Sequence, residues 1–129
     1  MVSADTNVIV RLLVGDDKIQ LKKAKQLFEQ EKIFIATSVV LECEWVLRYA
    51  YHFEPLAIAN AFLALFGLPN VTLQEQTVID DALAWHQQGM DFADAMHLAV
   101  SRHCDSFATF DKKFIKSAEK FTQFTVREP

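Results

Sequence analysis

The chain has 129 residues, of which 51% are hydrophobic and 12% aromatic, so it suits one folded domain with a single core and excludes a disordered chain. Its formal charge of −4 argues against a generally basic nucleic-acid binder, but it is compatible with a nuclease whose carboxylates hold metal ions. With only three Gly and three Pro, the sequence lacks the turn chemistry of an all-β fold.

Short apolar runs alternate with amphipathic stretches along the whole chain, without an internal repeat or a linker. The apolar runs predict β-strands at 2–5, 33–37, 71–73, 106–109 and 121–126. The periodic stretches predict helices at 6–15, 17–32, 39–51, 55–67, 74–88 and 91–104, with a short helix or turn at 111–119. This order predicts an α/β fold, a three-layer α/β/α sandwich with a mainly parallel central sheet, formed by residues 1–129 as a single domain.

The ends of the predicted helices carry capping residues. Thr6 or Asn7 is expected to cap the first helix and Gly15 to end it, because Gly adopts the left-handed conformation that closes a helix. Ser38 is expected to cap the helix that begins at residue 39, and Asp91 the helix in "DFADAMHLAVSRHC".

Cys43 and Cys104 lie inside apolar, helix-like patterns, which predicts two buried free thiols in a reducing compartment. The N-terminus has no basic region followed by a long apolar segment, so no signal peptide is expected. The longest apolar stretch, "AIANAFLALFGL", is too short to cross a bilayer. We therefore expect a cytoplasmic protein without a membrane segment.

Four acidic residues lie at the ends of predicted strands or in the first turns of the helices that follow: Asp5, Glu42, Asp94 and Asp111. The carboxyl ends of parallel strands meet at one edge of a sheet, where binding sites form. Carboxylates that are forced together repel one another unless a cation neutralises them. Oxygen ligands select hard cations such as Mg²⁺ or Mn²⁺, which activate water for attack on a phosphodiester.

Each acid also has a purely structural interpretation. Asp5 could cap a strand end, Glu42 could be a surface acid, and Asp111 could be a turn residue. Asp94 follows Asp91 by three residues, as in a capping box, so it could serve the helix backbone. Glu44 lies two residues after Glu42 and is expected to point elsewhere, toward solvent.

Four segments in this order resemble the PIN-domain ribonucleases of the VapC type, the toxins of bacterial and archaeal toxin–antitoxin pairs. The resemblance covers nearly the whole chain, and it rests on "DTNVIVR" at Asp5, "TSVVLECEWVLR" around Glu42, "DFADAMHLA" around Asp94 and "ATFDKKF" around Asp111.

The resemblance implies a Mg²⁺- or Mn²⁺-dependent endoribonuclease, in which water attacks phosphorus and the 3′ oxygen leaves. It implies that Asp5, Glu42, Asp94 and Asp111 form the catalytic, metal-binding site, with Asp91 assisting the metals. Hydrogen bonds from neighbouring polar groups would orient these carboxylates, and the expected groups are Asn7, Thr109 and Ser38.

Basic and apolar segments suggest the partners. Lys112 and Lys113 adjoin Asp111 and could contact RNA phosphates, as could Arg11, although such runs also occur as solvated helix faces. In the family, the region that corresponds to "YAYHFEPLAIANAFLALFGL" contributes to a homodimer and to the groove for the antitoxin; ordinary core is the alternative. His97 follows Asp94 by one turn, so it either faces the site or packs between helices.

Three rival functions remain at this point. A PIN module could bind RNA or act as a scaffold without catalysis. A phosphatase of the haloacid dehalogenase type would need a second Asp where Asn7 stands. A flap-type DNA nuclease would need additional elements that a chain of 129 residues does not accommodate.

Overall fold

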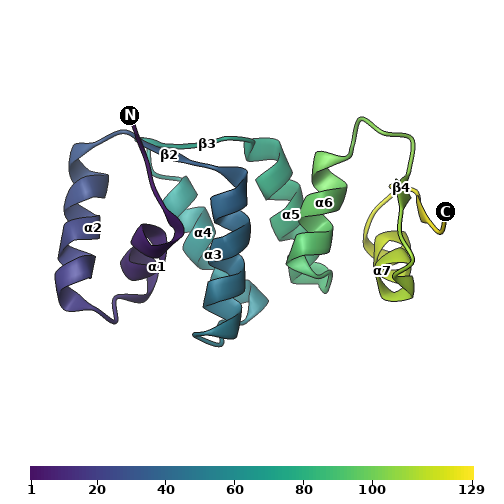
Figure 1. Ribbon diagram of the computed structural model, residues 1–129, viewed down its shortest axis with the longest axis horizontal. Helices are drawn as coiled ribbons and strands as arrows, with labels where there is room; N and C mark the ends of the chain where they lie inside the picture. The colour runs from purple at the N-terminus through teal and green to yellow at the C-terminus, as the bar shows by residue number, and fades with distance from the viewer. The chain divides into compact units, whose positions relative to one another are not determined.

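A computed structural model describes residues 1–129, with helices and short strands alternating along the chain (Figure 1). The chain divides into two compact units, residues 1–75 (the N-terminal unit) and residues 76–129 (the C-terminal unit). No helix is both long enough and apolar enough to cross a membrane.

The N-terminal unit contains three strands and four helices. In chain order they are β1 (Val2–Ser3), α1 (Thr6–Val14), α2 (Lys18–Gln30), β2 (Ile33–Ile35), α3 (Thr37–Tyr49), α4 (Pro55–Phe66) and β3 (Val71–Leu73). The strands form a parallel sheet in the order β1-β2-β3, with Val2 opposite Ile33 and Ile33 opposite Val71. Helix α1 packs against α2 and α3 (Figure 1). Ile33 and Ile35 are fully buried, so the central strand anchors the core of this unit.

The helix ends in this unit differ from two of the expected caps. Asp5, rather than Thr6 or Asn7, is the N-cap of α1, because its backbone carbonyl already accepts the N–H groups of Val8 and Ile9. Ala36, rather than Ser38, is the N-cap of α3, since the chain enters the helix directly after β2. Gly15 ends α1 in the left-handed conformation (φ 72°), as expected.

The C-terminal unit contains α5 (Gln76–Gln88), α6 (Phe92–Val100), β4 (Phe107–Ala108), α7 (Lys112–Phe121) and β5 (Val126–Arg127). Helices α5 and α6 pack together as a hairpin. The turn between them passes through Gly89 at φ 123°, a backbone conformation that other residues rarely adopt. Strand β4 pairs with β5 in parallel.

Helix α6 ends at Val100, four residues before the expected end at residue 104. The Ser101 hydroxyl donates a hydrogen bond of 2.7 Å to the carbonyl of His97, and Ser101 leaves the helical conformation. Cys104 therefore lies beyond the helix and is exposed, so the prediction of a buried thiol is wrong there; it is confirmed for Cys43.

The predicted α/β fold with parallel strands is confirmed, but the strands pair as two sheets, one in each unit, and not as a single continuous sheet. The first sheet has three strands and the second has two strands of two residues each. Residues 101–106, between α6 and β4, contain turns and bends but no helix or strand.

Glu44 is buried, with 1% of its surface exposed, so the expectation that it faces solvent is wrong. Its carboxylate accepts a hydrogen bond of 2.9 Å from Nε of Arg48, one turn later on α3. A buried carboxylate is tolerated when such a charged partner neutralises it. Alternate residues of a helix point in different directions, which separates this structural acid from Glu42.

Candidate active site

In the N-terminal unit, Asp5 and Glu42 are the two candidate site acids. Asp5 follows the buried Ala4 at the end of β1, and its side chain makes no capping hydrogen bond to α1. Glu42 lies on α3, which packs against α1. Both side chains are exposed, so both carboxylates are available to a ligand.

Thr6 connects these two acids. It follows Asp5 directly, it is buried, and its hydroxyl donates a short hydrogen bond to Oε1 of Glu42. The bond fixes the direction of the Glu42 carboxylate, a role for which sequence reasoning had named Asn7 and Ser38. Thr6 was missed because the partners are 36 positions apart; its polarity at a buried position of α1 was the only available signal.

The Cys43 thiol lies next to this pair of acids. Burial, together with the negative charge of Glu42 and, more weakly, of Asp5, raises the pKa of Cys43 to about 12. The thiol thus stays protonated at neutral pH, and it donates to the backbone carbonyl of Thr6 at 3.9 Å. Cys43 therefore acts as a packing group and not as a nucleophile.

In the C-terminal unit, three acids surround one hollow of about 320 Å³. Asp91, Asp94 and Asp111 line it together with Lys113 and Ser117. Asp91 and Asp94 come from the start of α6, Asp111 and Lys113 from the start of α7, and Ser117 from the middle of α7. The fold therefore brings together three of the acids that the sequence singles out, from two helices.

Two of these acids are also helix caps. Oδ1 of Asp91 accepts the N–H of Asp94 at 3.0 Å, and Oδ1 of Asp111 accepts the N–H groups of Lys113 and Phe114 at 2.9 and 3.2 Å. In each case Oδ2 takes no part in the cap. The structural and functional interpretations are therefore compatible, because capping fixes the carboxylate while one oxygen stays available.

The surroundings of the hollow perturb the pKa of Asp94. Its pKa is raised, first by desolvation and then by the charges of Asp91 and Asp111, while His97 and Lys113 partly offset the rise. Desolvation and repulsion at Asp94 thus exceed what His97 and Lys113 offset.

This donor set fits a hard divalent cation. It consists of carboxylate oxygens, and the pKa of Asp94 is raised by desolvation and, after that, by two neighbouring carboxylates. As the side chains stand, no three acidic, His or Cys groups converge closely enough to hold one ion. Binding a metal would therefore require these carboxylates to change rotamer.

The remaining predicted site residues lie in different surroundings. Asn7 is exposed and lines a groove between α1 and α2. Thr109 accepts the backbone N–H of Asp111 at 3.1 Å, so it positions that residue through the backbone. Ser38 is exposed on the first turn of α3. Lys112 lines a separate hollow against β5, whereas Lys113 lines the acidic hollow.

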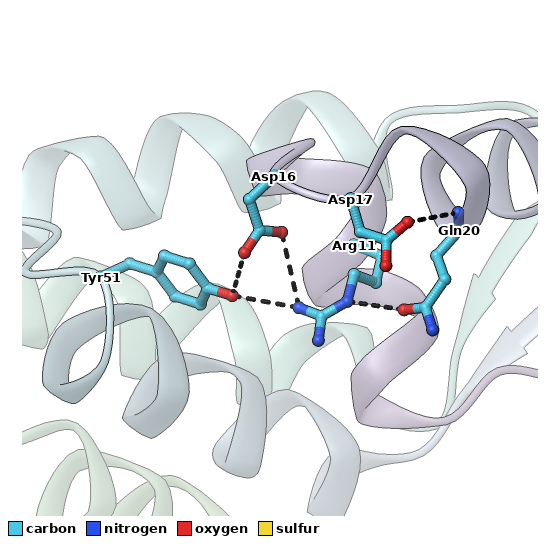
Figure 2. A network of polar contacts seen from close by, with 5 residues as sticks. All are labelled: Arg11, Asp16, Asp17, Gln20 and Tyr51. Atoms are coloured by element: carbon cyan, nitrogen blue, oxygen red, sulfur yellow. Dashed lines mark hydrogen bonds and ion pairs between the residues drawn. The ribbon is translucent and has the colours of Figure 1, made fainter.

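Arg11 is held by three partners within the N-terminal unit (Figure 2). Its Nε donates to Oε1 of Gln20 at 2.7 Å and its Nη1 donates to the Tyr51 hydroxyl at 3.0 Å. Nη1 also lies 3.5 Å from Asp16, whose other oxygen accepts the Tyr51 hydroxyl at 2.8 Å. The network ties α1 to the start of α2 and to the connection that follows α3. The predicted contact of Arg11 with RNA stays a prediction.

His97 is exposed on α6, so it does not pack between helices. Its charge favours the ionised form of Asp94, which places it within electrostatic reach of the acidic hollow.

Replacement of Asp94 by Asn is expected to stabilise the metal-free protein at neutral pH. A raised pKa in the folded state means that stability is fully present below the unfolded pKa of Asp and is lost as the pH rises through the folded pKa. The urea midpoint of Asp94→Asn in EDTA should exceed that of the wild type at pH 7, and the gap should close at acidic pH. Asp105→Asn, an exposed acid outside the hollow, should show no such gap, and an equal gap at both pH values would contradict the repulsion.

Replacement of Thr6 by Val removes the hydroxyl that holds Glu42 and keeps the shape of the side chain. Loss of such an orienting group typically lowers metal affinity or activity about 10–100-fold. Isothermal titration with Mn²⁺ should show this loss for Thr6→Val, whereas Thr6→Ser should bind like the wild type. Equal affinity in both variants would exclude an orienting role for Thr6.

Comparison with known proteins identifies the family of the chain. The sequence model of the PIN domain matches residues 2–120, and no curated protein matches significantly. Among solved structures, the toxin VapC20 of Mycobacterium tuberculosis, described as cleaving the sarcin-ricin loop, is 21% identical over 97% of this chain and 99% of its own, with a TM-score of 0.45. Because this superposition is loose, it supports no statement about the substrate or partner of this chain. The match of the PIN model includes every candidate acid in both units, and the chain therefore belongs to the PIN domain family.

Proposed function

We propose that the chain is a Mg²⁺- or Mn²⁺-dependent endoribonuclease and the toxin of a type II toxin–antitoxin pair. The observation that carries this proposal is the gathering of Asp91, Asp94 and Asp111 around one hollow in a chain of the PIN family. All four motif acids of the resemblance are present, which favours catalysis over a passive fold.

We propose further that the two compact units act as one PIN domain, since the family model spans both of them. On this proposal Asp5, Asp94 and Asp111 hold a divalent ion directly or through water. Glu42, oriented by Thr6, positions a second ion or the attacking water. Asp91 assists through the oxygen that its helix cap leaves available.

The chemistry that a bound metal supplies is activation of water and neutralisation of charge on the phosphodiester. The chain itself orients the reactants. Water attacks phosphorus and the 3′ oxygen leaves, so the P–O bond to the 3′ oxygen breaks as the new P–O bond forms. Lys113, in the same hollow as the acids, is placed to bind a phosphate oxygen of the RNA.

A second candidate function is a non-catalytic PIN module that binds RNA or acts as a scaffold. The observation that could favour it is the absence of a converged group of three metal ligands in the side-chain positions as they stand. Metal-dependent cleavage of RNA separates the two functions directly.

We propose a homodimer and a cognate antitoxin as protein partners, in the cytoplasm where the RNA substrates lie. Helices α3 and α4 expose large apolar groups that an isolated chain leaves in water, among them Trp45 (52% exposed) and Leu63 (54%). Trp45 stacks on Tyr49 at 5.1 Å between ring centroids, which gives α3 a rigid aromatic surface. Exposed aromatic and aliphatic groups of this size favour protein interfaces.

Replacement of Asp5 by Asn should abolish cleavage and leave the fold intact. Asn is as good an N-cap as Asp, but it removes the negative charge that a metal requires, so we expect a loss of about 100-fold or more. The measurement is cleavage of total RNA by purified, antitoxin-free protein with Mg²⁺ or Mn²⁺, beside an EDTA control.

Glu54→Gln is the matched control, because Glu54 is likewise an N-cap whose side chain makes no capping bond. It should cut RNA like the wild type. Cleavage by Asp5→Asn at the wild-type rate would overturn the site assignment, and folded wild-type protein that cuts nothing would favour the binding module.

Light scattering should give about twice the monomer mass of 14.7 kDa for the wild type. Trp45→Glu combined with Leu63→Glu should shift the protein to the monomer, since it places charge on the exposed surfaces of α3 and α4. Ile19→Glu alters an apolar side chain that is 72% exposed on α2, and it should leave the dimer intact. A wild-type monomer would refute the dimer.

A further inference from the structure

Helix α2 carries an unusual concentration of positive charge. Four lysines and one glutamate fall within its 13 residues, in a chain whose net charge is −4. Three of the lysines, Lys18, Lys22 and Lys25, lie one turn apart along one side of the helix and line a hollow of about 520 Å³. These three residues are named here the lysine stripe. All three are exposed.

The lysine stripe works against the stability of its own helix. Lys18 is the first residue of α2, where the positive end of the helix macrodipole disfavours a cation. The N-cap Asp17 precedes it and accepts the N–H of Gln20, and no acidic residue lies in the first turn itself. Like charges spaced three and four positions apart also repel each other. None of the three ammonium groups has an ion-pair partner in the structure. An anionic partner that neutralises the stripe would remove this cost.

The composition of the stripe favours a nucleic acid over a protein as that partner. Protein interfaces are depleted in lysine and enriched in aromatic groups and arginine, whereas phosphates are neutralised by lysine and arginine alike. Besides the three lysines, the hollow along the stripe is lined by Gln26, Glu29 and Gln30 of α2, with Leu21 as its one apolar group. Lys18 and Lys25 are seven positions apart, so the stripe is about 10 Å long, enough for two or three phosphates of a single strand.

The lysine stripe belongs to the same compact unit as Asp5. Helix α1 begins directly after Asp5 and packs beside α2 (Figure 1). A groove of about 430 Å³ runs between the two helices, with Asn7 on one wall and Lys23 on the other. Polar and cationic groups are thus present on both sides of α2, toward α1 and along the stripe.

We propose that Lys18, Lys22 and Lys25 form a phosphate-binding track that holds single-stranded RNA outside the acidic site. This inference rests on the proposed ribonuclease function, whose substrate it extends along α2. The track contacts the RNA backbone and carries no base specificity, since lysine ammonium groups read charge alone.

The test compares two triple variants. The stripe variant combines Lys18→Gln, Lys22→Gln and Lys25→Gln, and the control variant combines Lys32→Gln, Lys120→Gln and Arg127→Gln. The second triple removes the same charge from exposed positions outside the stripe. Gln preserves helix propensity, and every variant also carries Asp5→Asn so that RNA is not cut. Binding of a labelled single-stranded homopolymeric RNA is measured by anisotropy over a series of salt concentrations.

The stripe variant should lose affinity and its slope of log affinity against log salt should fall by about 2, since each phosphate contact on a single strand contributes about 0.7. The control triple should retain the larger part of the slope. The thermal midpoint of the stripe variant should stay level or rise, because repulsion within α2 is relieved. The proposed track would be overturned if the salt slope of the stripe variant equalled that of the control variant. It would also be overturned if the stripe variant lost binding to polyglutamate and kept its binding to RNA.

These outcomes are separate from the proposed function. In an Asp5-intact background, cleavage of RNA by the stripe variant with a raised KM and an unchanged kcat supports both proposals. Cleavage with an unchanged KM and an unchanged salt slope overturns the track and leaves the ribonuclease standing. Salt-dependent binding that needs the stripe, with no cleavage by the wild type, overturns the ribonuclease alone.

Discussion

Repulsion between carboxylates is the constraint on which the functional part of the structure depends. Asp91, Asp94 and Asp111 line one hollow, and the pKa of Asp94 is raised there first by desolvation and then by the charges of Asp91 and Asp111. The fold limits the repulsion by local means: two of the acids each give one oxygen to a helix N-terminus, and Lys113 supplies one positive charge. What is left uncompensated is negative charge, which the proposed metal-dependent nuclease would use to bind a cation.

In the N-terminal unit a neighbouring hydroxyl takes the corresponding role. The short parallel strands β1 and β2 lead into Asp5 and α3, respectively. The Thr6 hydroxyl donates to Glu42 and does not cap the start of α1. Cys43 beside them is protonated and inert. Backbone N–H groups at helix starts thus fix Asp91 and Asp111 in the C-terminal unit, and a hydroxyl fixes Glu42 in the N-terminal unit.

Much of the fold follows from residues that act over one or two turns. Gly15, Pro55 and Asp91 mark helix ends that the sequence predicts, because each acts through its own backbone or through the next turn. Thr6 and Glu44 behave differently from the prediction because their roles depend on folded neighbours. The Thr6 hydroxyl bonds to a residue 36 positions away, and Glu44 lies on the buried side of α3. The division of the strands into two sheets is likewise a tertiary outcome, and strands of two residues carry too short a pattern to predict pairing. The acids themselves could be found from sequence, since their order matches a family motif set.

The most direct measurement is the anomalous diffraction signal of Mn²⁺ in crystals of the wild-type protein. The proposed function predicts a manganese peak with carboxylate oxygens of Asp5 and Asp94 among its ligands, at roughly the 2.0–2.2 Å expected for a hard divalent ion. The peak should disappear in crystals of Asp94→Asn. Well-ordered acids with no manganese on them, at concentrations that support activity in PIN-family nucleases, would contradict the central claim that these carboxylates form a metal site.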